Sequence, residues 1–167
     1  MIIYEVKPDL IIEIGTNVGG GALYIADLLE SIGNGIIHTI DLEIKSDPML
    51  LEHNRIKLFS GGWESYDIEL TRNFEKILII EDASHLYSDT LGVLNKFSSI
   101  VSENSYFIIE DGIINELGLE KEYCGGPLRA IREFLPIHPE YIVDRKWCDM
   151  FGKNATFNVN GYLKKLK

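Results

Sequence analysis

The sequence predicts an α/β domain built on a doubly wound, mostly parallel sheet with an antiparallel hairpin at its C-terminal edge. Two patterns indicate this fold. Short, continuous apolar runs alternate with stretches of helical periodicity, as in parallel sheets that helices cover on both faces. Near the C-terminus, two strand-like runs follow one another with no helical stretch between them, which predicts an antiparallel pair added at one edge.

The expected elements follow in order from residue 10. Parallel strands are expected at residues 10–14, 36–40, 55–59, 77–80 and 106–109. Helices are expected at residues 19–32, 88–101 and 126–135. Pro127 suits the start of the last helix, because its missing N–H has no helical partner there. Residues 141–143 and 156–163 are the expected strands of the hairpin.

Composition narrows the class of protein. With 167 residues, 46% of them hydrophobic and 25% charged, the chain fits a single globular domain over residues 1–167. Its net charge of −10 argues against nucleic acid as a partner, because phosphate backbones require a basic surface. No apolar run is long enough for a membrane span, and the first residues are not expected to act as a signal peptide. Cys124 and Cys148 are too few for a disulfide framework, so we expect a cytoplasmic protein with reduced thiols.

Acidic residues gather at the carboxyl ends of the expected strands: Glu13, Asp41, Asp82, Glu110 and Asp111. In open α/β sheets of this Rossmann-like kind, the ligand crevice lies beyond those ends. The sequence therefore predicts a ligand site there, with a chance grouping of solvated acids as the alternative.

A glycine-rich turn runs from Glu13 to Gly21, between the first expected strand and the first helix. Glycine allows a tight turn and close approach of a ligand, and the helix N-terminus offers free N–H donors. A dinucleotide fingerprint requires glycine where Asn17 stands, and a P-loop requires lysine where Gly21 stands, so both motifs are excluded. An acid before the turn suits a cationic ligand better than a phosphate.

This segment resembles the first motif, E-x-G-x-x-x-G, of class I S-adenosylmethionine-dependent methyltransferases. The resemblance implies that Asp41 accepts hydrogen bonds from the cofactor ribose. It also implies that Gly61 and Trp63 border the adenine, although packing explains Trp63 equally well. The expected cofactor-binding residues are Glu13, Gly15, Thr16, Asn17, Gly19, Asp41, Leu42, Gly61, Trp63 and Asp82.

A second group of residues predicts a metal site. Asp82 ends the fourth strand, and Glu110 and Asp111 end the fifth. Neighbouring parallel strands would bring these carboxylates together, where they need a counter-charge, and Mg²⁺ prefers such oxygen ligands. His85, three residues after Asp82, is suited to take a proton from a hydroxyl near neutral pH. Solvated loop acids, a helix cap by Asp82 and a surface histidine are the alternatives.

Residues 80–85, 105–111, 125–135 and 160–164 are similar to the cephalosporin hydroxylase / rhamnosyl O-methyltransferase family and to the related macrolide sugar O-methyltransferases. The resemblance extends over nearly the whole chain from Lys7. It implies a Mg²⁺-dependent O-methyltransferase in which Asp82, Glu110 and Asp111 bind the metal and His85 is the catalytic base. The implied acceptor is a hydroxyl of a sugar or another small molecule.

The chain departs from that family in two places. It has fewer than ten residues before the first expected strand, and the segment between Asp41 and Arg55 is modest in length. These departures suggest a more open site, an acceptor site completed by a second copy in a homo-oligomer, or reduced activity.

Three other functions stay open at this level. A non-haem iron hydroxylase is disfavoured because two histidines and a carboxylate are the usual ligands, and only His85 of four histidines lies near the acids. A nicotinamide-dependent dehydrogenase is disfavoured by Asn17. A non-catalytic module that binds S-adenosylmethionine is the third. Calorimetry with S-adenosylmethionine, with and without Mg²⁺, distinguishes these functions.

Overall fold

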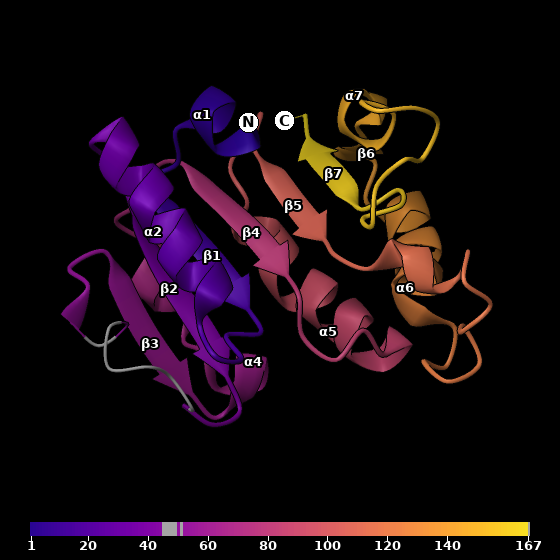
Figure 1. The fold of residues 1–167 in the computed structure, drawn as a ribbon, viewed down its shortest axis with the longest axis horizontal. Helices are drawn as coiled ribbons and strands as arrows, with labels where there is room; N and C mark the ends of the chain where they lie inside the picture. Colours follow the sequence, from indigo (N-terminus) through magenta and orange to yellow (C-terminus); the bar gives the residue numbers. More distant parts are fainter. Residues whose placement is uncertain (45–49, 51, 167) are drawn as a thin grey trace.

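The structure is a computed structural model that describes residues 1–44, 50 and 52–166. Within these residues, a seven-stranded sheet has the order β3-β2-β1-β4-β5-β7-β6 (Figure 1). The parallel strands are β1 Leu10–Ile14, β2 Ile36–Asp41, β3 Ile56–Ser60, β4 Ile77–Glu81 and β5 Tyr106–Ile109. Strand β7 (Tyr162–Lys165) runs antiparallel to both β5 and β6 (Tyr141–Val143). The predicted fold class is confirmed.

Helices cover both faces of the sheet. One face packs against α1 (Ile2–Val6), α2 (Gly20–Ile32) and α7 (Arg145–Cys148). The other packs against α4 (Gly62–Ser65), α5 (Tyr87–Phe97) and α6 (Gly126–Phe134). Among the described residues, no helix is long and apolar enough to cross a membrane.

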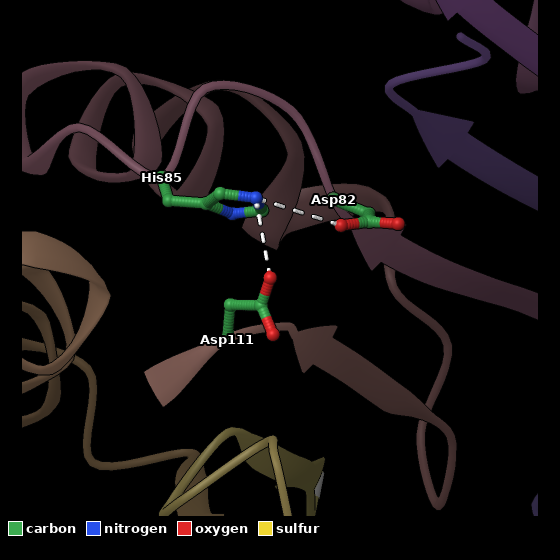
Figure 2. Close-up of side chains that lie close together, drawn as sticks. All are labelled: Asp82, His85 and Asp111. Carbon is green, nitrogen blue, oxygen red and sulfur yellow. Dashed lines mark ion pairs between the residues drawn. The ribbon is translucent and has the colours of Figure 1, made fainter. Parts of the chain in front are cut away.

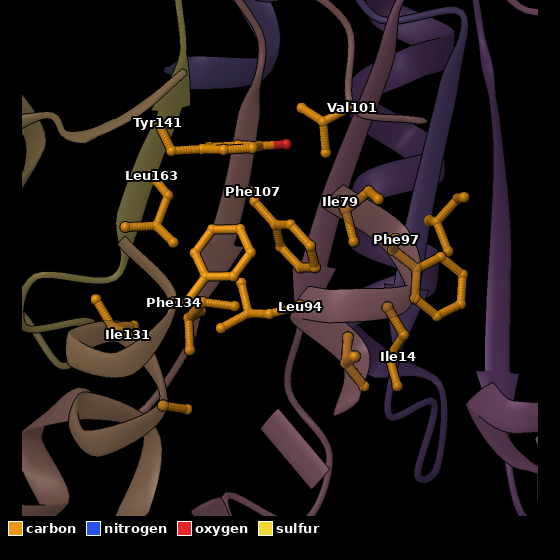
Figure 3. Close-up of a cluster of buried hydrophobic side chains, with 14 of the residues drawn as sticks. Ile14, Ile79, Leu94, Phe97, Val101, Phe107, Ile131, Phe134, Tyr141 and Leu163 are labelled. Carbon is orange, nitrogen blue, oxygen red and sulfur yellow. The ribbon is translucent and has the colours of Figure 1, made fainter. Parts of the chain in front are cut away.

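The core on the α5 and α6 face is rich in aromatic side chains (Figure 3). Phe97 of α5, Phe107 of β5 and Phe134 of α6 are fully buried there. Burying one such side chain contributes about 1.5–3 kcal/mol relative to leaving it exposed. This packing holds α5 and α6 against the part of the sheet that contains β4 and β5. The loops that follow these two strands therefore start from fixed positions.

Two of the expected elements are wrong in detail. The helix expected at residues 88–101 ends at Phe97 and continues as a 3₁₀ turn, Ser98–Ile100. The strand expected at residues 156–163 begins only at Tyr162, and residues 156–161 form an irregular loop.

A short helix, α7, also lies between β6 and β7, where none was expected. The Asp144 side chain caps it by accepting the Lys146 N–H, and Trp147 is buried against the sheet. Four residues are too few to show a helical period, so the sequence pattern could not reveal this helix.

The irregular loop before β7 is held against the end of β5. The Ile109 N–H donates to the Gly161 carbonyl at 2.8 Å, and the Ile113 N–H donates to the Phe157 carbonyl at 2.9 Å. A methyl group on Gly161 would lie 1.9 Å from the Ile109 carbonyl oxygen, so only glycine allows this approach. The contacts bring residues 157–161 beside Glu110 and Asp111.

His38 of β2 is buried among Phe59, Tyr66 and Phe74, and its Nδ1 lies 2.6 Å from the Tyr66 hydroxyl. Burial, with a smaller effect of Lys57, lowers the pKa of His38 to about 4. A folded-state pKa below the unfolded value stabilises the fold above pH 6.5, and this stabilisation is lost as the pH falls toward 4.

We therefore expect the wild-type protein to lose about 2 kcal/mol more unfolding free energy than His38→Gln between pH 7.5 and pH 5. Urea unfolding at both pH values measures this difference. His53→Gln is the control, because His53 lies outside the aromatic cluster. Equal losses in wild type and His38→Gln would contradict the assignment.

Candidate active site at the carboxyl ends of the strands

A cavity of about 490 Å³ opens at the carboxyl ends of β1, β2 and β4, a size within the usual range for small-molecule sites. It lies where β1 meets β2 on one side and β4 on the other, which is the crossover point expected to bind ligands. The predicted site residues that line it are Gly15, Asn17, Asp41, Leu42, Trp63, Asp82 and His85.

The turn after β1 is fixed against β4. The Asp82 N–H donates to the Ile14 carbonyl at 2.8 Å. Gly15 has a φ of 105°, and a methyl group there would lie 2.0 Å from the Asp82 carbonyl oxygen. Both the backbone angle and the close approach therefore require glycine at this position.

Asp41, at the end of β2, holds the same turn from the other side. One of its carboxylate oxygens accepts the Asn17 N–H and the other accepts the Leu42 N–H, each at 2.7 Å. Asn17 has a left-handed backbone with a φ of 49°, a conformation that asparagine tolerates well. Each oxygen keeps a second lone pair, so the carboxylate can still accept a hydrogen bond from a ligand in the cavity.

Three predicted cofactor residues of the turn are buried and do not line the cavity. Glu13 and Thr16 are buried, and the Thr39 hydroxyl bridges them with contacts of 2.5 Å and 2.6 Å. Gly19 is buried as the N-terminal cap of α2. Burial raises the pKa of Glu13 to about 7, against the effect of the Thr39 hydrogen bond. Their position is that of residues that support the turn.

Trp63 both lines the cavity and packs against α5. A methyl group on Gly92 would lie 2.5 Å from the Trp63 ring, so the indole rests directly on that helix. Gly62 lines the cavity, whereas the neighbouring Gly61 caps α4 and does not. Trp63 is thus both a packing residue and part of the cavity wall.

The predicted acids and histidine meet at the ends of β4 and β5. Figure 2 shows the His85 ring pointing toward the side chains of Asp82 and Asp111. His85 Nε2 lies 3.3 Å from Asp111 Oδ2 and 3.9 Å from Asp82 Oδ1. One ligand atom from each of these three residues lies within 4.8 Å of the other two, close enough to share a metal ion.

Glu110 is next to Asp111 in the sequence, but it is not one of the three residues whose ligand atoms lie within 4.8 Å of one another. Burial, followed by the charges of Asp82 and Asp111, raises the pKa of Glu110 to about 7, and a hydrogen bond from Asn158 opposes the rise. Burial also raises the pKa of Asp82. A cation among carboxylates that lie this close together would reduce the repulsion between their charges.

The backbone at the site is strained in the same places. His85 has a φ of 57° and Asp111 a φ of 54°, both in the left-handed region that most side chains avoid. Such strain costs about 1–3 kcal/mol per residue and gathers at functional sites in many proteins. Here the two left-handed residues are the pair whose side chains face each other at 3.3 Å.

Sequence reasoning missed two buried polar residues next to these acids. Glu81, the last residue of β4, is fully buried, and burial raises its pKa to about 7. Asn158 precedes β7 and contacts both Glu110 and Asp111. Glu81 stands beside Asp82 in a run of acids, which was a usable indication, but nothing in the local sequence marks Asn158.

A family model described as "Rhamnosyl O-methyltransferase/CmcI" matches residues 1–166. The chain belongs to this family. The rhamnosyl O-methyltransferase of Mycobacterium leprae is 28% identical to it over 173 residues, covering 97% of this chain and 73% of that protein. The rhamnosyl O-methyltransferase of Mycobacterium tuberculosis is 27% identical over 173 residues, covering 97% of this chain and 69% of that protein.

Solved structures share the fold of this family member. A cmcI structure with Mg and SAM has a TM-score of 0.69 at 21% identity, covering 99% of this chain and 68% of that chain. The MycE methyltransferase from the mycinamycin biosynthetic pathway, in complex with Mg and SAH, has a TM-score of 0.58 at 20% identity. That match covers 81% of this chain and 40% of MycE. By its family, the chain is an S-adenosylmethionine-dependent O-methyltransferase, as the sequence predicted.

Proposed function

We propose that this family member moves a methyl group from S-adenosylmethionine to a hydroxyl of a sugar or another small molecule, with Mg²⁺ bound beside the acceptor. The observation that supports this most strongly is a single cavity with Asp41 on one side and the Asp82–His85 pair on the other. That arrangement would place a bound methyl donor next to a proton acceptor.

On the donor side, the turn and Asp41 would hold the cofactor. Gly15 and Asn17 line the cavity, and Asp41 has lone pairs left for ribose hydroxyls. Trp63 offers a rigid apolar wall. Glu13, Thr16 and Gly19 would act by keeping the turn in place, since they are buried in it and do not line the cavity. When bound, S-adenosylmethionine supplies the electrophilic methyl group.

The donor set fits a hard divalent cation. Asp82 and Asp111 offer carboxylate oxygens within reach of one another, and Glu110 is crowded by both charges. Carboxylates of this kind suit Mg²⁺. When bound there by Asp82, Glu110 and Asp111, the cation would lower the pKa of a coordinated acceptor hydroxyl and fix its position.

His85 would accept the hydroxyl proton at Nε2. This atom faces Asp82 and Asp111, and the Asp111 carboxylate at 3.3 Å would stabilise the imidazolium that forms. Nδ1 is buried without a hydrogen-bond partner among the described residues, and it would carry the hydrogen of the neutral ring while Nε2 accepts the proton. Holding the hydroxyl in line with the methyl group supplies the rest of the rate enhancement.

A sugar acceptor is favoured by the names of the relatives, which are rhamnosyl O-methyltransferases. Vicinal ring hydroxyls could chelate a cation, which agrees with the proposed metal site. A cytoplasmic location, the absence of nucleic acid and membrane partners, and assembly into a homo-oligomer stay predictions from the sequence.

Metal dependence is the central test. We expect excess EDTA to reduce methyl transfer to simple rhamnosides at least about 100-fold, with Mg²⁺ restoring the rate. Asp111→Asn, which keeps a residue tolerant of the left-handed backbone, should abolish the Mg²⁺ response while calorimetry still detects S-adenosylmethionine binding. Asp27→Asn, an exposed change on α2, is the control.

Full activity in EDTA would rule out the metal-assisted mechanism. Binding of S-adenosylmethionine without any binding of Mg²⁺ or transfer to rhamnosides would favour a non-catalytic module. Tight NADH binding would contradict the cofactor assignment.

A further inference from the structure

Among the described residues outside β4, β5 and their following loops, the Asn158 side chain is the one that contacts both Glu110 and Asp111. Its side-chain oxygen accepts the Asp111 N–H at 3.4 Å. Its amide also lies close enough to the Glu110 carboxylate to favour the ionised form, so it lowers the pKa of that acid against the effect of burial. The amide oxygen of Asn158 therefore faces Asp111, and the amide nitrogen faces Glu110.

The contact with Asp111 replaces a missing backbone partner. Ile109 and Ile113 donate their N–H groups to backbone carbonyls of the loop that contains residues 157–161. Between them, the Asp111 N–H bonds to the Asn158 side chain instead. The Asn158 side chain thus takes the place of a backbone acceptor for the Asp111 N–H.

Asn158 itself is held firmly. It is 9% exposed, its N–H donates to Thr156 Oγ1 at 3.1 Å, and its carbonyl accepts the Gly161 N–H at 2.9 Å. Arg145 of α7 ties down the rest of the loop through bonds to Asn154 and Asn160. The amide therefore projects from a fixed base and does not have to be ordered when it contacts the acids.

We propose that Asn158 is a positioning residue that sets the relative orientation of Glu110 and Asp111 for binding a divalent cation. This inference rests on the proposed function, because it concerns the proposed metal ligands. Removing the amide would leave the Asp111 N–H without its partner and the Glu110 carboxylate free to turn away. Partners that orient metal ligands typically contribute about 10–100-fold to metal affinity.

The test measures metal binding without turnover. Mn²⁺ binding is followed by electron paramagnetic resonance in the presence of S-adenosylhomocysteine, at a temperature well below the unfolding midpoint of every variant. We expect Asn158→Ala to raise the Mn²⁺ Kd about 10-fold, with the S-adenosylhomocysteine Kd unchanged by calorimetry. Asn158→Ser, whose hydroxyl is too short to reach both acids, is a milder second variant with the same expected direction.

Asn154→Gly is the matched control. It removes an asparagine of the same loop that contacts Arg145 and not the acids, and glycine tolerates its left-handed backbone. Wild-type Mn²⁺ affinity in both Asn158 variants would overturn the inference and leave the proposed function standing. Equal weakening in Asn154→Gly would also overturn it, because loosening of the loop would then be the cause. No Mn²⁺ binding by the wild-type protein would overturn both.

Discussion

Replacing His85 by asparagine should lower the rate of methyl transfer about 1000-fold, because the proton of the acceptor hydroxyl loses its acceptor. His85 Nε2 faces the carboxylates of Asp82 and Asp111, where the proposed acceptor would lie. Asparagine tolerates the left-handed backbone at this position but cannot take up a proton near neutral pH. The expected loss therefore falls on kcat.

Three measurements separate chemistry from folding in this variant. Single-turnover rates should fall, while the S-adenosylmethionine Kd and the urea unfolding midpoint stay close to the wild-type values. The control is His138→Asn, since His138 pairs with Glu140 at 3.0 Å and is not among the residues that line the cavity. A His85→Asn enzyme with the wild-type rate would show that another group takes the proton.

Gly15→Ala should lower the free energy of unfolding by about 4 kcal/mol and abolish S-adenosylmethionine binding. The added methyl group would lie 2.0 Å from the Asp82 carbonyl oxygen, which is backbone and cannot turn away. The φ of 105° adds strain of its own. Relief requires the glycine-rich turn to separate from β4, which would displace both this turn and Asp82.

Gly20→Ala is the control for this experiment. Gly20 is the first residue of α2, and a methyl group there meets nothing within 4 Å. Its unfolding free energy should stay within about 1 kcal/mol of the wild-type value. Urea denaturation and calorimetry on both variants provide the comparison. If Gly15→Ala were as stable as Gly20→Ala, the close contact between the turn and β4 would be wrong.

The parallel half of the fold could be predicted because its determinants are local. Residues 10–14 and 106–109 form strands with the expected bounds, since continuous apolar runs of this length suit a strand covered on both faces. The turn at Gly15 and the acids at strand ends could be predicted for the same reason. A parallel sheet aligns its carboxyl ends, so order along the chain is enough to bring Asp82 and Asp111 together.

The region after β6 could not be predicted in the same way. The sequence pattern at residues 156–161 suggested a strand, but left-handed Asn160 and the contact of Gly161 with Ile109 turn the chain into a loop. Helix α7 depends on one capping side chain and one buried tryptophan. Such features arise from contacts between segments that are far apart in the sequence, so the local periodicity of the sequence does not predict them.

The sequence by itself determined the parallel half of the sheet, the glycine-rich turn and the acids that follow β4 and β5. The tertiary structure decided which of those residues face the cavity. Glu13 and Thr16 belong to the motif, but they are buried and do not line the cavity, and their polar atoms find a partner in Thr39. Asn158 lies 47 residues after Asp111 in the sequence. It contacts Glu110 and Asp111 because its loop packs against the end of β5.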